Sequence, residues 1–499
     1  MKRWYWRVSS RIKRIVAGKW FFYGVLALFA VHTLWLVFSS NLLPFDEYYH
    51  VGIIDFYAKQ WSPIITWQPP EMSVYGDVTR LSAYLYHYLM SFPYRFVGLF
   101  TDSQTIQIIV LRIMNLGMVV TGIVLFRKLF RLAKISDGIS NVATLVFVMT
   151  PIVPLLSAQN NYDNAMFMLT PLVLLYALKS IQKPLKATNL IWLVTLGMVA
   201  TLIKFNFIVI FGAVVGFVLL SLFVQYKLKL WVKLKKSFKP GGRVLVVALA
   251  ASGVVTLLFA ERVGYNVIKY HEVKVSCDSV QSVEVCEQYS PWRRNKNALA
   301  DKTGELPYGG VTGFSVHWVK TITKGYFAVF ANIIPDNLNK PDPYGHYEFA
   351  GLARSSYFVG RILLAAGLLA LLVALPQLLK NSQFNRLILL SFAGLVMSLW
   401  VFNFAFYLKY ERAYAIQARY ILPLVLPMLV VMGQAIRIVS AKKRMGWLAS
   451  VMGILIVAYC LWGGSTVWVA RSRDNWYWPS QQVRDFNNLV QEYLEPITP

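Results

Sequence analysis

Apolar runs long enough to cross a bilayer recur from residue 20 to the C-terminal region. A membrane helix needs about 20 predominantly apolar residues, because the hydrocarbon core is about 30 Å thick and each helical residue rises about 1.5 Å. The pattern predicts about eleven such helices. The expected spans are 20–40, 106–126, 139–156, 165–180, 189–204, 207–224, 244–260, 355–375, 387–407, 421–436 and 446–469.

Two long segments separate these spans on one side of the membrane, 41–105 and 261–354. Within them, apolar and aromatic residues at helical spacing predict amphipathic helices in the interface over 46–60, 81–96 and 317–334. The segment 335–347 is rich in Pro, Asn, Asp and Gly, and is expected to be a loop. The predicted fold class is an all-α polytopic membrane protein.

The charge distribution orients the predicted helices. The sequence has 50 Lys and Arg against 23 Asp and Glu, a formal charge of +27. With the spans above, every basic cluster falls on the same side, as cytoplasmic loops require. These clusters are 2–19, 127–134, 179–186, 227–243, 380–386 and 437–444. We therefore expect the N-terminus inside, the C-terminus outside, contact with membrane lipids and no nucleic-acid partner.

Other features concern the cell compartment. The first span lacks a small-residue cleavage site and is expected to be a retained anchor. No Asn-x-Ser/Thr sequence occurs, which favours the cytoplasmic membrane of a bacterium. Cys277 and Cys286 share an outer loop and are candidates for a disulfide. Cys460 lies in the last span, where we expect a packed free thiol.

Acidic residues stand directly after the first span. Asp46, Glu47 and His50 share one face of a predicted helix, because residues three and four apart are neighbours. A carboxylate there is suited to take a proton from an acceptor hydroxyl, and its neighbour would raise its basicity. The alternative is structural, with Asp46 as the N-cap of a helix that starts near Glu47.

A second carboxylate lies in the polar turn 159–164 on the same outer side. Asp163 is a candidate to orient the acceptor or, together with Asp46, to bind a divalent cation. The alternative is again a cap, here for the span that begins at Ala165. A metal cofactor stays open at this point.

Two cations are placed against the positive-inside rule. Lys204 ends a span on the outer side, and Arg419 enters another span from outside, in Gln417-Ala418-Arg419-Tyr420. A phosphate partner would explain both, since Arg offers bidentate hydrogen bonds and Lys a point charge. Snorkelling of Lys204 to the interface is the alternative. Arg80 and Arg112 are weaker candidates, for which we expect structural ion pairs.

The acidic pair, the amphipathic outer loop, the polar turn with Asp163, the outer Lys204 and the late Gln-x-Arg-Tyr together resemble the GT-C glycosyltransferases. Bacterial protein O-mannosyltransferase-like and lipid A aminoarabinose transferase-like members are most similar. The resemblance covers most of the chain, but segment 261–354 departs from the family pattern. It implies a catalytic membrane module over 1–224 with outer loop 41–105. A second membrane region over 225–499 would contain the basic cytoplasmic loop 225–243.

The resemblance also implies an activity. It is transfer of a hexose or pentose, with inversion, from a polyprenyl-phosphate donor to an acceptor glycan, lipid or protein at the outer face. Asp46 would be the general base, and Glu47 and Asp163 further catalytic carboxylates. The substrate-binding candidates are His50, Arg80, Lys204, Arg419 and Tyr420. A transporter or lipid flippase for envelope glycan precursors, and a non-catalytic scaffold, are the alternatives.

Overall fold

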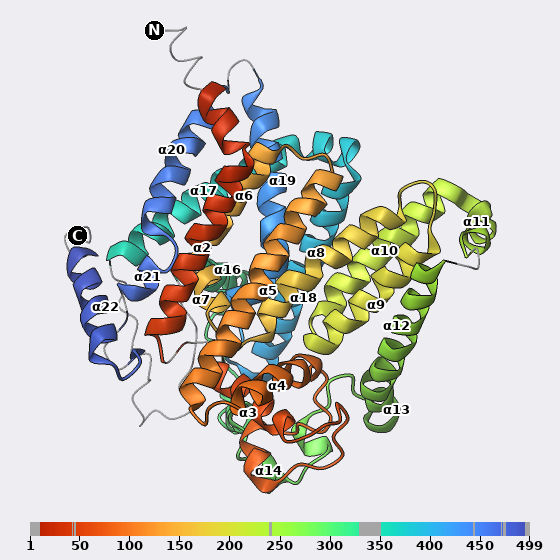
Figure 1. The fold of residues 1–499 in the computed structure, drawn as a ribbon, viewed down its shortest axis with the longest axis vertical. Helices are drawn as coiled ribbons and strands as arrows, with labels where there is room; N and C mark the ends of the chain where they lie inside the picture. Colours follow the sequence, from red (N-terminus) through yellow and green to blue (C-terminus); the bar gives the residue numbers. More distant parts are fainter. Residues whose placement is uncertain are drawn as a thin grey trace.

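A computed structural model describes residues 10–41, 43, 46–238, 242–328, 351–442, 445–470, 472 and 476–494. In this part of the chain the regular elements are helices, and the only extended pairing is an isolated bridge between Ser40 and Tyr477 (Figure 1). The predicted all-helical class is confirmed.

Seven helical segments among the described residues are long and apolar enough to cross a membrane. They contain α2 (Lys19–Ser39), α5 (Gln104–Leu132), α10 (Phe207–Tyr226) with η2 (Lys227–Lys229) and α11 (Leu230–Ser237), α12 (Arg243–Phe259) with η3 (Ala260–Gly264) and α13 (Tyr265–Tyr270), α17 (Gly351–Asn381), α18 (Gln383–Tyr410), and η5 (Ala418–Ile421) with α19 (Leu422–Ser440).

The other four predicted spans also coincide with helices, but these are shorter or less apolar. They are α6 (Asp137–Val148) with α7 (Ile152–Ser157), α8 (Tyr162–Ser180), α9 (Ala187–Ile203) and α20 (Trp447–Trp462). The chain is thus a multi-pass helical membrane protein whose helices match the predicted positions.

Two predicted spans are wrong in their continuity. The span 139–156 is divided between α6 and α7, because Pro151 has no N–H and its ring would clash with a carbonyl one turn earlier. The span 446–469 ends at Trp462, before Gly463 and Gly464; a separate short helix, α21 (Thr466–Val469), follows. The two breaks meet, since the Gly464 N–H donates a 2.6 Å hydrogen bond to the Met149 carbonyl.

The non-membrane helices gather mainly at the lower end of Figure 1, where α3, α4 and α14 lie. Those of the first outer segment are α3 (Glu47–Ala58), η1 (Pro70–Tyr75) and α4 (Leu85–Gly98). Those of the second are η4 (Cys277–Ser279), α14 (Val283–Cys286), α15 (Ser290–Ala300) and α16 (Val311–Ala328). The helices predicted over 46–60 and 81–96 therefore correspond to α3 and α4. The helix predicted over 317–334 corresponds to α16 from residue 317 to its end at Ala328, and residues 329–334 lie outside the described part of the chain. The predicted loop 335–347 lies outside the described residues.

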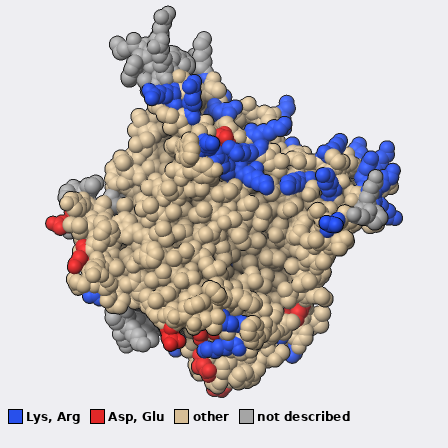
Figure 2. All heavy atoms as spheres, in the orientation of Figure 1, with Lys and Arg blue, Asp and Glu red and all other residues tan. Residues whose placement is uncertain are grey.

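Charge separates the two ends of the molecule (Figure 2). Lys and Arg gather at the end where α5 finishes and around α11, while Asp and Glu gather mostly at the opposite end, beside α3 and α14. The exposed basic residues at the first end include Lys128, Arg131, Lys134, Lys233 and Lys235. The basic residues assigned to one side from the sequence therefore lie mainly at one end of the molecule, and the side of the membrane that this end faces stays a prediction.

The interior places the polar turn 159–164 between packed helices. The start of α8 lies against α5, and α9 returns antiparallel beside α8, so that Lys204 ends near Asp163. On the opposite flank, the chain after α21 pairs with the end of α2: the Asn41 N–H donates to the Trp476 carbonyl at 2.8 Å. The last helix, α22 (Gln481–Leu494), is tied to α2 by a hydrogen bond from Trp35 to Asn487.

Candidate active site

Asp46 occupies an unusual backbone position at the start of α3. Its φ of 68° lies in the left-handed region, which Asp tolerates better than most residues. In this conformation its carboxylate makes no capping hydrogen bond to α3. The side chain is 57% exposed and accepts a 2.6 Å hydrogen bond from Arg419 Nη2. Asp46 therefore stands at the predicted cap position without acting as a cap.

Arg419 belongs to η5, the short helix that leads into α19, and its side chain is buried. Besides the Asp46 contact, its Nε lies 3.8 Å from Asp163 Oδ2. The adjacent Tyr420 places its ring 4.6 Å from Lys204 Nζ. Arg419 thus lies between two carboxylates that are more than one hundred residues apart in sequence.

The Asp163 side chain does not cap α8, because the nearby Asn161 does so. The Asn161 side chain is the N-cap of α8 and accepts the hydrogen bond from the Asp163 N–H at 3.0 Å. The Asp163 carboxylate is instead paired with Lys204, whose backbone ends α9 in an extended conformation. Both side chains are buried, with exposed fractions of 2% and 9%.

Four charged residues therefore form one cluster, made by Asp46, Asp163, Lys204 and Arg419 and called here the open cluster. They come from four segments: the start of α3, the start of α8, the end of α9 and η5. Buried charges are costly unless they are paired, and this cluster balances two anions with two cations. Because Asp46 is exposed, the cluster is accessible from the outer-loop side.

A small groove adjoins the open cluster. Its lining includes Lys204 and Tyr420, and otherwise consists mainly of apolar residues from α8, α10, α18 and α19. These are Met166, Phe207, Ile210, Leu395, Leu399 and Pro423. The groove has a volume of only about 20 Å³, so it marks the place where an apolar helix surface meets the buried ammonium group of Lys204.

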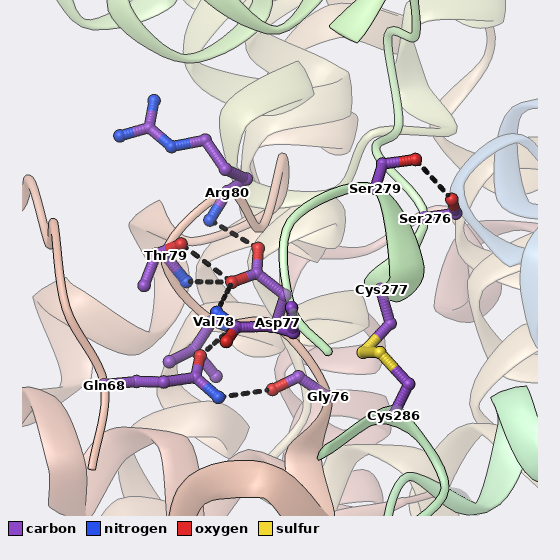
Figure 3. Close-up of a disulfide and its surroundings, with 11 residues drawn as sticks. Gln68, Gly76, Asp77, Val78, Thr79, Arg80, Ser276, Cys277, Ser279 and Cys286 are labelled. Carbon is purple, nitrogen blue, oxygen red and sulfur yellow. Dashed lines mark hydrogen bonds between the residues drawn. A yellow bond between two sulfur atoms is a disulfide. The ribbon is translucent and has the colours of Figure 1, made fainter. Parts of the chain in front are cut away.

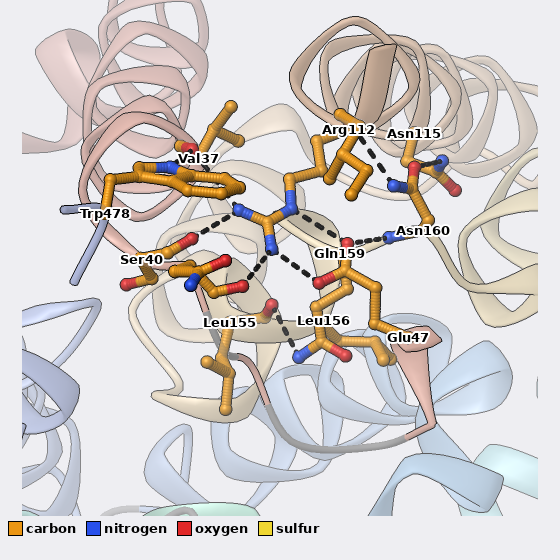
Figure 4. A network of polar contacts seen from close by, with 12 residues as sticks. Val37, Ser40, Glu47, Arg112, Asn115, Leu155, Leu156, Gln159, Asn160 and Trp478 are labelled. Atoms are coloured by element: carbon orange, nitrogen blue, oxygen red, sulfur yellow. Dashed lines mark hydrogen bonds and ion pairs between the residues drawn. The ribbon is translucent and has the colours of Figure 1, made fainter. Parts of the chain in front are cut away.

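Glu47 lies in a different network, with Arg112 of α5 (Figure 4). Arg112 Nε and Nη2 donate to the two Glu47 carboxylate oxygens at 2.8 and 2.5 Å, and Nη1 donates to the Ser40 carbonyl at 2.5 Å. Glu47 also accepts from the Asn160 N–H at 2.9 Å. We call this the closed cluster, since the Arg112 side chain is fully buried and that of Glu47 is 8% exposed.

His50 borders the open cluster without joining it. Its ring packs at 4.5 Å against Tyr162, whose ring lies 5.0 Å from Lys204 Nζ. His50 Nδ1 lies 2.9 Å from His87 Nε2. Burial lowers the pKa of His50 well below its usual value and that of His87 to about 3. Both rings are therefore neutral at physiological pH.

Arg80 lies apart from the other predicted residues. Its guanidinium pairs with Glu261 at 3.1 Å and lies 4.8 Å from the Tyr265 ring. Its backbone N–H donates a 2.8 Å hydrogen bond to the Asp77 carboxylate (Figure 3). The expected structural ion pair describes Arg80 better than the substrate-binding assignment, and the same holds for Arg112.

The sequence reasoning missed Tyr162 and Tyr289. Tyr162 precedes Asp163 in the polar turn, and that adjacency was the only available signal. Tyr289 comes from the second outer segment, and its ring lies 6.4 Å from Tyr49 of α3. Burial, followed by the negative charge of Asp46, raises the pKa of Tyr289 to about 12. The distant segment thus contributes a wall beside Asp46.

A disulfide joins Cys277 to Cys286 and closes the loop that leads to Tyr289, with the two Cα atoms 5.7 Å apart (Figure 3). Cys460 is a half-buried free cysteine in α20. In the described part of the chain, no three His, Cys, Asp or Glu side chains are grouped to hold a metal ion. Asp46 and Asp163 each pair with a cationic side chain, and a metal role for them stays a prediction.

Comparison with known proteins gives distant structural likenesses. No family model and no curated protein matches the sequence. ArnT from Cupriavidus metallidurans is similar with a TM-score of 0.48 and 13% identity over 95% of this chain and 68% of ArnT. ArnT bound to undecaprenyl phosphate gives 0.45 and 15%, over 94% and 69% of the two chains.

The oligosaccharyltransferase of Archaeoglobus fulgidus gives a TM-score of 0.45 and 13% identity, over 95% of this chain and 60% of that one. ArnT and this oligosaccharyltransferase are GT-C superfamily glycosyltransferases. The sequence resemblance names the same superfamily. Since every score lies below 0.5, we base the functional proposal on the geometry of the site.

Proposed function

We propose that the chain is an inverting membrane glycosyltransferase that moves a sugar from a polyprenyl-phosphate donor to an acceptor at its outer face. The observation that carries the proposal is the open cluster itself. It unites an accessible carboxylate, Asp46, with two buried cations, Lys204 and Arg419, and an apolar groove reaches the Lys204 end. A base, a pair of cations for the phosphate and an apolar surface for the lipid are the parts that this reaction needs.

The proposed reaction is a single displacement at the anomeric carbon of the sugar. An acceptor hydroxyl oxygen forms a bond to the anomeric carbon as the bond from that carbon to the phosphate oxygen breaks. Asp46 takes the hydroxyl proton, and polyprenyl phosphate leaves with the bonding electron pair. One displacement from the opposite face inverts the anomeric centre. A lipid phosphate is already a good leaving group, so no general acid is required, unlike glycoside hydrolysis.

Lys204 and Arg419 would stabilise the negative charge that grows on the departing phosphate. Cations fixed in a buried site do this better than water, because they need no reorganisation during the reaction. Asp163 would hold Lys204 in place, since the two side chains are already paired and buried. Tyr420 would form one wall of the phosphate site, beside Lys204.

Glu47 has a positioning role in this proposal rather than a catalytic one. It anchors the first turn of α3 to α5 through Arg112, directly beside the residue that must accept the proton. His50 would support Tyr162 from behind. The membrane of a bacterium, with the open cluster facing outward and the basic end inside, is the setting that the charge polarity favours.

The direct test uses the purified full chain in detergent with undecaprenyl-phosphate-linked sugars and an envelope extract as acceptor, and follows label transferred from the lipid. Asp46→Asn should remove transfer while expression and folding are kept. Asp102→Asn changes an exposed carboxylate of the same outer segment and should have no effect. Full activity of Asp46→Asn would refute the assigned base. Addition of EDTA decides whether a divalent ion takes part.

A further inference from the structure

A second pocket lies on the first outer segment and is lined by residues of α3. It has a volume of about 360 Å³ and is formed between α3 and η1. Its lining combines aromatic rings with charged side chains, among them Tyr48, Asp55, Lys59, Trp67, Glu71 and Tyr75. None of these side chains belongs to the open cluster or to the small groove beside Lys204.

The pocket is held by defined contacts (Figure 3). The Gln68 side chain donates to the Gly76 carbonyl at 3.0 Å and accepts from the Val78 N–H at 2.8 Å, which closes the loop that carries η1. Gly52 in α3 leaves room for Tyr75, because a Cβ there would lie 1.9 Å from the Tyr75 hydroxyl oxygen. The loop closed by Gln68 and the space at Gly52 of α3 therefore fix the position of Tyr75 in the pocket wall.

The chemistry of the wall is that of a saccharide site. Tyr48 and Trp67 are 80% and 68% exposed, although large aromatic rings are normally buried. Asp55 and Lys59 form an ion pair at 2.9 Å, and Glu71 adds an exposed carboxylate. A pyranose has an apolar C–H face that packs on aromatic rings and hydroxyl groups that donate to carboxylates. The single excess negative charge disfavours an anionic ligand.

A row of packed tyrosines links the wall of the pocket to the surroundings of the open cluster. The Tyr75 ring lies 6.4 Å from Tyr48 and 5.9 Å from Tyr49, and Tyr49 lies 6.4 Å from Tyr289, the residue that senses the charge of Asp46. Tyr48 is also only two residues from Asp46 on the same chain segment. A chain of sugar units bound in the pocket would thus extend toward the proposed base.

We propose that this pocket binds a neutral saccharide unit of the acceptor, so that the acceptor is a glycan rather than a protein segment. The role of this saccharide as the acceptor rests on the proposed function, whereas saccharide binding itself does not require the reaction. Trp67 and Tyr48 would pack against the sugar ring. Glu71 and Asp55 would accept hydrogen bonds from its hydroxyl groups.

Binding is measured on the full-length protein in lipid nanodiscs by saturation-transfer NMR. The probes are neutral trisaccharides of glucose, galactose, mannose and N-acetylglucosamine, with a mixture of unstructured nonapeptides as the competing class. We expect transfer to at least one trisaccharide, and a titration of that signal should give a Kd about tenfold higher for Trp67→Ala, which corresponds to about 1.4 kcal/mol. Trp61→Ala is the matched control, because Trp61 is equally exposed in the same segment and outside the pocket.

Glu71→Gln is the second variant; its exposed position makes a folding defect unexpected, and it should also weaken saccharide binding. Absence of signal from all trisaccharides, a signal unchanged in both pocket variants, or binding of the peptides instead would overturn the inference. Asp46→Asn should bind trisaccharide normally. Saccharide binding by a wild-type protein that transfers no sugar would refute the proposed function and leave this inference standing.

Discussion

Asp46 and Glu47 are consecutive carboxylates, and each is paired with an arginine from a distant membrane helix or its entry turn. In the closed cluster, Glu47 receives two hydrogen bonds from Arg112 and one from the Asn160 N–H. In the open cluster, Asp46 accepts a hydrogen bond from Arg419 and keeps 57% of its side chain exposed. The same pair of residue types therefore makes a fixed anchor at one position and an accessible base at the next.

The difference comes from the backbone and from the saturation of hydrogen bonds. The left-handed conformation of Asp46 turns its carboxylate away from α3, whereas Glu47 begins the helix and faces its buried side. Arg112 uses its remaining donors on the carbonyls of Val37, Ser40 and Asn41. Such a saturated network has no capacity for substrate. Asp163 Oδ2, by contrast, lies 3.8 Å from Arg419 Nε, beyond hydrogen-bonding distance.

The largest expected effect separates the two carboxylates by activity. Asp46→Asn should lower kcat for sugar transfer by about 10²–10⁴-fold, the usual contribution of a general base. The melting temperature should fall less than in Glu47→Gln, because Asp46 is largely exposed and the buried Arg419 keeps the Asp163 carboxylate at 3.8 Å. Transfer kinetics and thermal unfolding of the same preparation check both parts. A kcat within a factor of two of wild type would show that Asp46 is not the base.

The second effect separates them by stability. Glu47→Gln leaves the buried Arg112 charge without its partner, which typically costs about 3–5 kcal/mol. We expect a markedly lower melting temperature in detergent, with transfer per folded molecule retained at low temperature. Glu287→Gln, at an exposed ion pair with Lys296, is the control and should leave the melting temperature unchanged. A stable but inactive Glu47→Gln variant would instead place Glu47 in the chemistry.

Sequence reasoning reached the open cluster because its residues violate local expectations. Lys204 and Arg419 are cations on the side predicted to be the outer one, and Asp46 and Asp163 are carboxylates at the ends of apolar spans, so each position required an electrostatic partner. The positions of the helices could be predicted equally well, since hydropathy is a strong local signal. The breaks at Pro151 and at Gly463 were readable only in part, because a proline inside a membrane helix often produces a kink and not an end.

The features that the sequence could not supply are side-chain directions and the identity of distant partners. Helical spacing alone places Glu47 and Asp46 within one turn, and a φ of 68° at Asp46 cannot be inferred from composition. Arg80 and Arg112 met carboxylates from distant segments, Glu261 and Glu47, that no local pattern links to them. Tyr289 was out of reach for the same reason, since its place beside Tyr49 depends on how the second outer segment folds over the first.

A third, smaller effect concerns the neutral His50–His87 pair beside the open cluster. Burial lowers both pKa values, that of His87 to about 3. The unfolded chain titrates near pH 6.5, so it binds more protons than the folded chain below that pH, and stability falls as the pH falls. Between pH 7 and 5.5 the loss should be about 1 kcal/mol for each histidine. Melting temperatures measured across this range provide the test.

His87→Gln removes one of the two titrating groups and should flatten the pH dependence of the melting temperature. His317→Gln is the comparison: partial burial and the nearby Lys320 and Lys324 also lower the pKa of His317, but it is less buried than His87, so its removal should flatten the pH dependence less. A slope that His87→Gln leaves unchanged would assign the acid sensitivity to other groups, such as the carboxylates of the two clusters.

The smallest effect tests whether the two arginines differ as the two carboxylates do. Arg419→Lys keeps the charge of the open cluster but loses the planar fork, so the departing phosphate would keep a point-charge partner only. We expect transfer to fall about tenfold, equivalent to about 1.4 kcal/mol, with a near-normal melting temperature. Arg112→Lys should show the reverse pattern: it cannot satisfy both Glu47 oxygens and the surrounding carbonyls together, so stability falls while transfer per folded molecule persists. Equal behaviour of the two variants in both assays would erase the distinction between an open and a closed cluster.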